Sequence, residues 1–190
     1  MRRAVVIVIA LVALLAGAVL LLYPRGAEAT GRLAVGDPAP RFVTTGTLGG
    51  ETFRVDLASE IAKGPVVLYF YPAAFTTGCT LEANAFAEAM PRFRAAGATV
   101  LGLSADDLGT LRKFSVSECR GKFAVAPASK RMIADYGVAL KKAGVDTGVT
   151  TRTSYVVGSD GRIAFVHDDM DYHDHVRLTL AAVERLAATR

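Results

Sequence analysis

The sequence predicts an α/β domain in which helices flank a mixed central β-sheet, preceded by one N-terminal hydrophobic helix. Three observations lead to this class. Apolar residues make up 52% of the 190-residue chain and are concentrated in residues 4–23, which carry no charge. Two continuous apolar runs, residues 66–71 and 98–103, alternate with segments of helical periodicity, as in parallel strands joined by helices. A Ser-Asp-Gly turn at residues 159–161 lies between two further apolar runs and predicts a terminal antiparallel hairpin.

Residues 1–23 are predicted to be a transmembrane anchor or a signal peptide. Residues 4–23 would form an apolar helix about 30 Å long, which matches the core of a bilayer. Basic residues at positions 2 and 3 precede the segment and only Arg25 follows it closely, which favours a cytoplasmic N-terminus. We therefore expect a membrane-anchored domain on the extracytoplasmic side, either periplasmic or extracellular. The alternative is secretion after signal cleavage, because residues 27–29 have the small-x-small form of a cleavage site.

Residues 24–33 contain Pro, Gly and small polar residues and are predicted to be a linker, followed by one domain over residues 34–190. This length suffices for a single domain with a full-sized core. The formal net charge is only +4, and no run of Lys and Arg is interleaved with aromatic residues. A nucleic-acid-binding surface needs such a pattern, so this class of function is excluded.

Turn residues and periodicity predict the elements of the domain in order. Two prolines in residues 36–40 disfavour a helix at its start. A Leu-Gly-Gly turn at residues 48–50 then predicts a first hairpin between residues 41–45 and 52–55. The two apolar runs are expected to be strands buried on both faces. The remaining predicted elements are helices over residues 81–96, 106–118, 129–136 and 174–188, a short strand over 123–125, and strands over 153–157 and 162–166.

Cys79 lies just after the most apolar predicted strand and just before the first long helix. The carboxyl end of a central strand opens onto a crevice, and the N-terminus of a helix lowers the pKa of a thiol placed there. Many free cysteines are simply small buried hydrophobes. Position alone therefore leaves a reactive and a structural role open.

Pro72, Thr76 and Cys79 follow the spacing Pro-x-x-x-Thr-x-x-Cys. This segment resembles the active site of the peroxiredoxins, whose pattern the three residues match in register. Thr80 and Glu82 match the form common in the Q-type, bacterioferritin-comigratory-protein-like branch of the family.

The resemblance extends over residues 34–188. Residues 36–42, 97–104 and 151–157 look like the family's domain start, its next strand, and the strand that brings in its arginine. The resemblance implies a thioredoxin-like fold. It also implies a thiol-dependent peroxidase that reduces hydrogen peroxide and organic hydroperoxides.

The resemblance assigns each residue a role. Cys79 is the nucleophile that becomes a sulfenic acid, and Arg152 stabilises the thiolate and the oxygen that gains charge. The Thr76 hydroxyl contacts the peroxide or the sulfur, Pro72 shields the sulfur from water, and Glu82 can orient an arginine. Without the resemblance, these residues would be interpreted as a helix N-cap (Thr76), a strand terminator (Pro72), a surface arginine (Arg152) and a first-turn carboxylate (Glu82).

The chain departs from the family's commonest pattern at the second cysteine. Many Q-type members have a resolving cysteine five residues after the first, and that position is Asn84. Cys119, near the end of the second predicted helix, is the only other thiol. We expect Cys119 to attack the sulfenic acid of Cys79 and form a disulfide. The alternative is a one-cysteine enzyme that an outside thiol reduces directly. The expected reductant is a thioredoxin-like protein, and the expected state is a monomer or weak dimer.

Two further segments are expected to lie outside the site. Residues 167–175 contain three histidines and four aspartates without a fixed metal-binding spacing, so a solvated acidic loop is predicted and no metal. Residues 137–150 are predicted to be a flexible loop and lack the phosphate-binding glycine pattern. No cofactor is predicted.

Other functions of a strand–Cys–helix unit fit less well. A dithiol reductase needs a cysteine where Glu82 stands, and a copper-delivery protein needs one where Ala83 stands. A cysteine hydrolase would pair Cys79 with His167 or His173. The main alternative is a membrane-tethered thioredoxin-fold module for binding or thiol exchange, without peroxidase activity.

Overall fold

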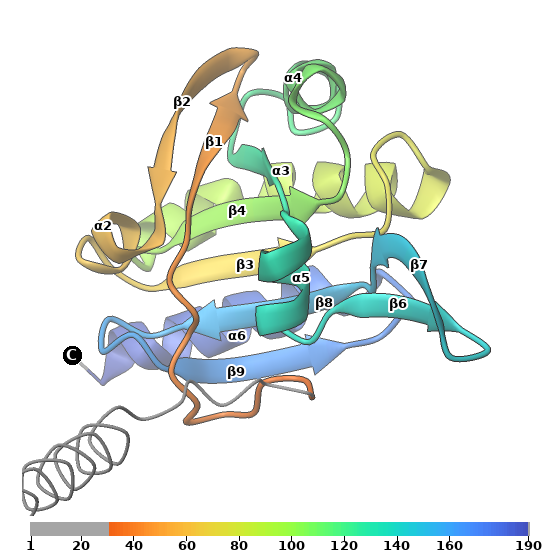
Figure 1. The fold of residues 1–190 in the computed structure, drawn as a ribbon. Coiled ribbons are helices and arrows are strands. Elements are labelled where there is room, and N and C mark those ends of the chain that lie inside the picture. The colour runs from red at the N-terminus through yellow and green to blue at the C-terminus, as the bar shows by residue number, and fades with distance from the viewer. Residues whose placement is uncertain (1–30, 190) are drawn as a thin grey trace, which may run out of the picture.

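The structure is a computed structural model that describes residues 31–189 (Figure 1). The predicted anchor or signal segment, residues 1–23, and residues 24–30 of the predicted linker lie outside the described residues. From residue 31 to residue 189, no helix is long and apolar enough to cross a membrane.

A seven-stranded mixed sheet forms the centre of the domain, as predicted. The strand order is β2-β1-β5-β4-β3-β8-β9. The central strands β3, β4 and β5 are parallel, whereas β8 runs antiparallel to β3 and β9 antiparallel to β8. The strands are β1 (Val43–Leu48), β2 (Glu51–Asp56), β3 (Val66–Phe70), β4 (Thr99–Ser104), β5 (Ala124–Pro127), β8 (Thr153–Val157) and β9 (Ile163–Asp168).

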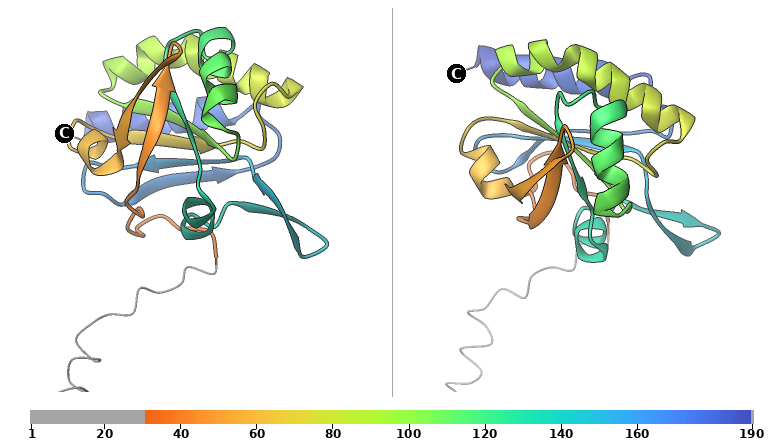
Figure 2. Two further views of the ribbon diagram at one scale, coloured as in Figure 1. Left: turned by 45° about the horizontal axis from the view of Figure 1, so that its top comes forward. Right: turned by 90° about the horizontal axis from the view of Figure 1, so that it is seen from above.

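Helices cover both faces of the sheet. Figure 2 shows α3 and α6 side by side on one face and α5 on the opposite face. The helices are α2 (Leu57–Ile61), α3 (Thr77–Ala95), α4 (Leu108–Ser117), α5 (Lys130–Asp135) and α6 (His175–Ala188). Because successive side chains of a strand point to opposite faces, Tyr69 and Phe70 of β3 lie in two different buried clusters. Cys79 and Cys119 both belong to the cluster beneath α3 and α6.

Three regions of the domain differ from the prediction. Helix α3 begins at Thr77, so Cys79 lies inside its first turn and not before it. Residues 137–150 were expected to be a flexible loop, and this is wrong, because they form an antiparallel hairpin of β6 (Ala139–Lys142) and β7 (Val145–Thr150). Ala143 and Gly144 form its turn with positive φ angles of 50° and 80°. The short helix α2 was not predicted, and the other elements differ from the prediction only at their ends.

Candidate active site

Cys79 lies where the chain turns from the central strand β3 into helix α3, and only 1% of its surface is exposed. It is the third residue of the helix, so it stands among N–H groups that have no partner within the helix. These groups and the positive end of the helix dipole favour a negative charge at this position. The loop before the helix is held in place by Asp106, whose carboxylate accepts hydrogen bonds from the Ala74 N–H (2.7 Å) and the Ser104 hydroxyl (2.8 Å).

Arg152 reaches Cys79 from the neighbouring strand. It directly precedes β8, and because β8 runs antiparallel to β3 with Thr153 opposite Phe70, the arginine arrives at the carboxyl end of β3. Its Nη2 lies 3.6 Å from the Sγ atom of Cys79, and its Nε donates to the carbonyl oxygen of Met170 at 3.0 Å. Only 5% of Arg152 is exposed. The structure thus places a fixed positive charge against the sulfur.

Glycine at position 78 leaves the space that this guanidinium occupies. A Cβ atom on Gly78 would lie 3.1 Å from Arg152 Nη2, which is tighter than most contacts of real side chains. The sequence analysis assigned neither Gly78 nor Asp106 a role in the site. The position of Asp106 two residues beyond a buried strand was the available signal, since carboxyl ends of central strands meet at one edge of a sheet.

Glu82 and the thiol of Cys79 are two acidic groups that contact Arg152. Glu82 lies one turn after Cys79 on the same face of α3, is fully buried, and forms a salt bridge through Oε2 with Arg152 Nη1. Burial raises the pKa of Glu82 to about 7, although the charge and hydrogen bonds of Arg152 act in the opposite direction. Arg152 therefore stands between two acidic groups, one thiol and one carboxyl.

Thr76 and Pro72 are on the loop between β3 and α3. Thr76 is exposed and occupies the N-cap position, but its hydroxyl donates to the Ala73 carbonyl oxygen at 3.0 Å and makes no capping hydrogen bond. Pro72 is partly buried and lies two residues after the end of β3. Of the predicted site residues, the structure brings Cys79 and Arg152 into contact and places Thr76 one helical turn before the sulfur.

Cys119 is a free, fully buried thiol just beyond the end of α4. Burial, with a smaller effect of Glu118, raises its pKa well above the ordinary range. The Glu118 carboxylate accepts a hydrogen bond from the Asn84 side chain at 3.4 Å. The segment that carries Cys119 thus lies beside the α3 position at which many Q-type members carry a resolving cysteine.

The tract of residues 167–175 is only partly the solvated acidic loop that was predicted. His173 is exposed, and it contacts Asp171. His175 is fully buried, because α6 begins there. Its Nδ1 lies 2.8 Å from the Ser154 hydroxyl. His175 was predicted to lie both in this loop and in the last helix, and the structure places it in the helix, where α6 packs on the sheet.

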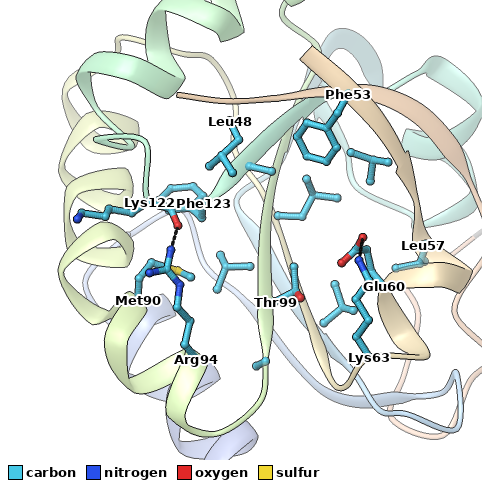
Figure 3. Close-up of a pocket in the computed structure, with 16 residues that line it drawn as sticks. Leu48, Phe53, Leu57, Glu60, Lys63, Met90, Arg94, Thr99, Lys122 and Phe123 are labelled. Carbon is cyan, nitrogen blue, oxygen red and sulfur yellow. Dashed lines mark hydrogen bonds and ion pairs between the residues drawn. The ribbon is translucent and has the colours of Figure 1, made fainter. Parts of the chain in front are cut away.

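A separate cavity of about 300 Å³ lies far along α3 from this site, between the β1–β2 hairpin, α2 and the start of β4 (Figure 3). Its walls are mainly apolar, and Lys63, Arg94 and Lys122 stand at its edge. Lys63 is paired with Glu60, and Arg94 donates to the Lys122 carbonyl oxygen. The cavity does not include Cys79 or Arg152 among its lining residues.

The chain is similar to known proteins in both sequence and fold. The model of the AhpC/TSA family matches residues 35–166. Peroxiredoxin Bcp of Escherichia coli strain K12 is 30% identical over 145 residues, which cover 75% of this chain and 90% of that protein. Chloroplastic peroxiredoxin Q of Oryza sativa subsp. japonica is 29% identical over 157 residues, covering 82% and 69%. The crystal structure of peroxidoxin BcpB from Mycobacterium tuberculosis superposes with a TM-score of 0.72 at 28% identity, covering 81% of this chain and 98% of that one.

Proposed function

The chain belongs to the AhpC/TSA family of peroxiredoxins, and we propose that it is a peroxidase that reduces hydrogen peroxide and organic hydroperoxides through the thiolate of Cys79. The observation that carries this proposal is the 3.6 Å contact between Cys79 Sγ and Arg152 Nη2 at the start of a helix. Both the guanidinium and the helix N-terminus stabilise a negative charge on the sulfur.

The first step is attack of the thiolate on one peroxide oxygen. The S–O bond forms as the O–O bond breaks, which gives a sulfenic acid, and the departing oxygen takes up a proton to leave as water or an alcohol. The departing oxygen gains negative charge in this step. Arg152 stabilises that charge but supplies no proton, because a guanidinium stays protonated.

Thr76 and Pro72 complete the proposed site. The Thr76 hydroxyl can both donate and accept, so it can orient the peroxide once it turns away from Ala73. Pro72 has no backbone N–H and limits the access of water to the sulfur. Their positions on the loop that leads into α3 support these roles.

Cys119 is proposed to be the resolving cysteine. Its thiol attacks the sulfenic acid of Cys79, which forms a disulfide and releases water. A disulfide requires Cα atoms within about 7 Å of each other, and the thiol must leave its buried position to react. The proximity of Glu118 to Asn84 supports this assignment, since it puts the Cys119 segment along the first part of α3.

A thioredoxin-like protein is the proposed reductant of the resulting disulfide.

We propose that the domain acts on the extracytoplasmic side of a membrane, anchored by residues 1–23. The charge-free run of residues 4–23, preceded by two arginines, supports this location. Mass spectrometry of the mature N-terminus tests it. Retention of residues 1–23 in the membrane fraction is expected, and a chain that begins near residue 30 would show cleavage instead.

Peroxide-dependent turnover tests the proposed activity. With thioredoxin, its reductase and NADPH, the purified chain should consume NADPH on addition of hydrogen peroxide or cumene hydroperoxide. Cys79→Ser should abolish this turnover. Cys119→Ser should allow a single oxidation of Cys79 but lose thioredoxin-driven turnover. Full turnover of Cys119→Ser, together with a wild-type chain in which Cys119 stays open to thiol labelling after peroxide, would favour the one-cysteine cycle.

A further inference from the structure

A second layer of buried polar groups lies behind Arg152 and has no part in the steps above. Glu82, Ser154 and His175 are all 0% exposed. Glu82 uses Oε2 to bind Arg152, whereas Oε1 has no hydrogen-bond partner within residues 31–189. This Oε1 lies 3.8 Å from Nδ1 of His175. A buried carboxylate oxygen without a hydrogen-bond partner costs free energy, and the polar atom beside this one is Nδ1 of His175.

The hydrogen bonds of His175 define which of its nitrogens carries the proton. Nε2 lies 2.9 Å from the carbonyl oxygen of Asp169, which can only accept, so Nε2 is the donor. Burial lowers the pKa of His175 to about 4, so the ring is neutral at pH 7. Nδ1 is then an acceptor, and it takes a hydrogen bond from the Ser154 hydroxyl at 2.8 Å. Glu82 Oε1 therefore lies near a ring nitrogen that carries no proton, which offers no donor to an ionised carboxylate and suits a protonated one.

The charge balance of the site allows only one of its two acids, Cys79 or Glu82, to be ionised at a time. Arg152 supplies one positive charge, and Cys79 and Glu82 can each supply one negative charge. If both acids ionised, the buried site would carry a net negative charge, which low-dielectric surroundings penalise.

The other titratable groups that face the site do not offset that charge. They include Tyr69 and Tyr71 beneath α3, His167 of β9, whose ring centroid lies 4.5 Å from that of His175, and Asp169 and Asp171 of the loop before α6. None of them is a permanent cation. The site is therefore balanced when either the thiol or the carboxyl is ionised, but not both.

We propose that Glu82, supported by His175, holds a proton in exchange for the one that Cys79 gives up. The S–H bond of Cys79 breaks, an O–H bond forms on Glu82, and the net charge of the site stays at zero. The new O–H group donates to Nδ1 of His175 once the 3.8 Å gap closes and the Ser154 hydroxyl, which occupies the Nδ1 lone pair in the structure, turns away. The charge of Arg152 is then available to the sulfur of Cys79. This inference rests on the proposed function, since only a thiolate attacks peroxide. His175 is a positioning residue that acts through Glu82.

The substitution Glu82→Gln separates this proposal from a purely orienting role of Glu82. Glutamine keeps an oxygen for Arg152 and an N–H for His175, and so imitates the protonated carboxyl. The readout is the pH midpoint of the reaction of Cys79 with iodoacetamide, measured on the full chain in a Cys119→Ser background. We expect this midpoint to fall by about one pH unit, which is about a tenfold gain in thiolate below the midpoint. An unchanged or higher midpoint would overturn the proposal.

The substitution His175→Phe tests the second half of the mechanism. The ring volume is kept but the acceptor is lost, so Glu82 should stay ionised and the midpoint should rise by about one pH unit. The same substitution made together with Glu82→Gln should shift it no further, because the carboxyl is then absent. An equal shift in both backgrounds would contradict proton exchange through Glu82. His175→Gln retains an acceptor and should restore most of the wild-type midpoint, and the exposed His173→Phe should leave it unchanged.

Two features keep the outcomes separable. If His175→Phe fails to fold by circular dichroism, the direction of the shift in Glu82→Gln alone decides. Alkylation uses no peroxide, so a chain with these midpoint shifts but no peroxidase activity would overturn the proposed function and leave the proton exchange standing.

Discussion

At the scale of single residues, the position of one guanidinium explains most of the chemistry of the site. Arg152 binds a backbone carbonyl, a carboxylate and a sulfur through three different nitrogens. Its planar fork matches these directions, whereas an ammonium group is a point charge on a flexible stem. Glu82 and Met170 therefore determine where the charge of Arg152 lies relative to Cys79.

Arg152→Lys should keep the charge but lose this geometry. We expect the second-order rate of Cys79 oxidation by hydrogen peroxide to fall on the order of 10²-fold, as when one oriented donor is removed from a site of developing charge. Stopped-flow fluorescence or quenched thiol counting measures this rate. Arg177→Lys is a matched control, because Arg177 pairs with Asp174 on the surface. A rate within twofold of wild type would argue against oriented stabilisation.

His175 makes a prediction about stability at low pH. Its pKa in the folded protein is lowered by burial from 6.5 to about 4, so its contribution to stability is fully present above pH 6.5 and is lost as the pH falls through 4. Over that range the unfolding free energy of Glu82→Gln should fall by roughly 2–3 kcal/mol relative to the double variant Glu82→Gln/His175→Phe. The Glu82→Gln background removes the titration of Glu82, whose raised pKa acts in the opposite direction and which the proposal couples to His175.

Urea denaturation at the two ends of that pH range checks this expectation. The exposed His173→Phe should show the same pH dependence as wild type. If Glu82→Gln lost as much stability with His175→Phe as without it, the ring of His175 would accept its proton as readily in the folded as in the unfolded chain, which would contradict the prediction.

At the scale of elements, the segment after α4 must change conformation if Cys119 is to react. Its backbone is held by hydrogen bonds from the Cys119 N–H to the Phe114 carbonyl oxygen (3.1 Å) and from the Lys122 N–H to the Cys119 carbonyl oxygen (2.9 Å). Arg120 and Gly121 turn the chain with positive φ angles of 51° and 59°. These bonds keep the thiol buried in the reduced protein.

Oxidation should therefore loosen this segment. We expect amide hydrogen exchange over residues 114–122 to be faster in the peroxide-oxidised chain than in the reduced chain, since the helix end must open to form the disulfide. Mass spectrometry of peptides from this region measures the exchange. Cys119→Ser should show no such difference, and a disulfide-bonded chain with unchanged exchange would contradict an opening of α4.

The same scale shows where the sequence could and could not predict structure. The buried strands and Asp-Gly turn were predictable, because continuous apolar runs and turn residues carry strong local signals. The β6–β7 hairpin was missed because its residues are polar, rich in glycine and mostly exposed, so no burial pattern marks it. The start of α3 was missed because Thr77 and Gly78 are weak helix formers that the N-terminus of a packed helix tolerates.

At the scale of the whole molecule, sheet topology brings the reactive residues together. Cys79 follows β3 and Arg152 precedes β8, and these strands are neighbours although 73 residues separate the two side chains. The family resemblance pointed to this pair from its motifs. The contact of His175 with Glu82 could not be predicted, because it depends on how α6 docks beside α3.

The central claim, that Cys79 is a peroxidatic thiol, is tested most directly by its own oxidation. The measurement is the second-order rate at which hydrogen peroxide converts Cys79 to a sulfenic acid, trapped with dimedone and located by mass spectrometry in the Cys119→Ser chain. The site described here predicts a rate at least about 10³-fold above that of a free thiol, with the adduct on Cys79. A rate no higher than that of a free thiol would contradict the peroxidase and favour a binding or thiol-exchange module.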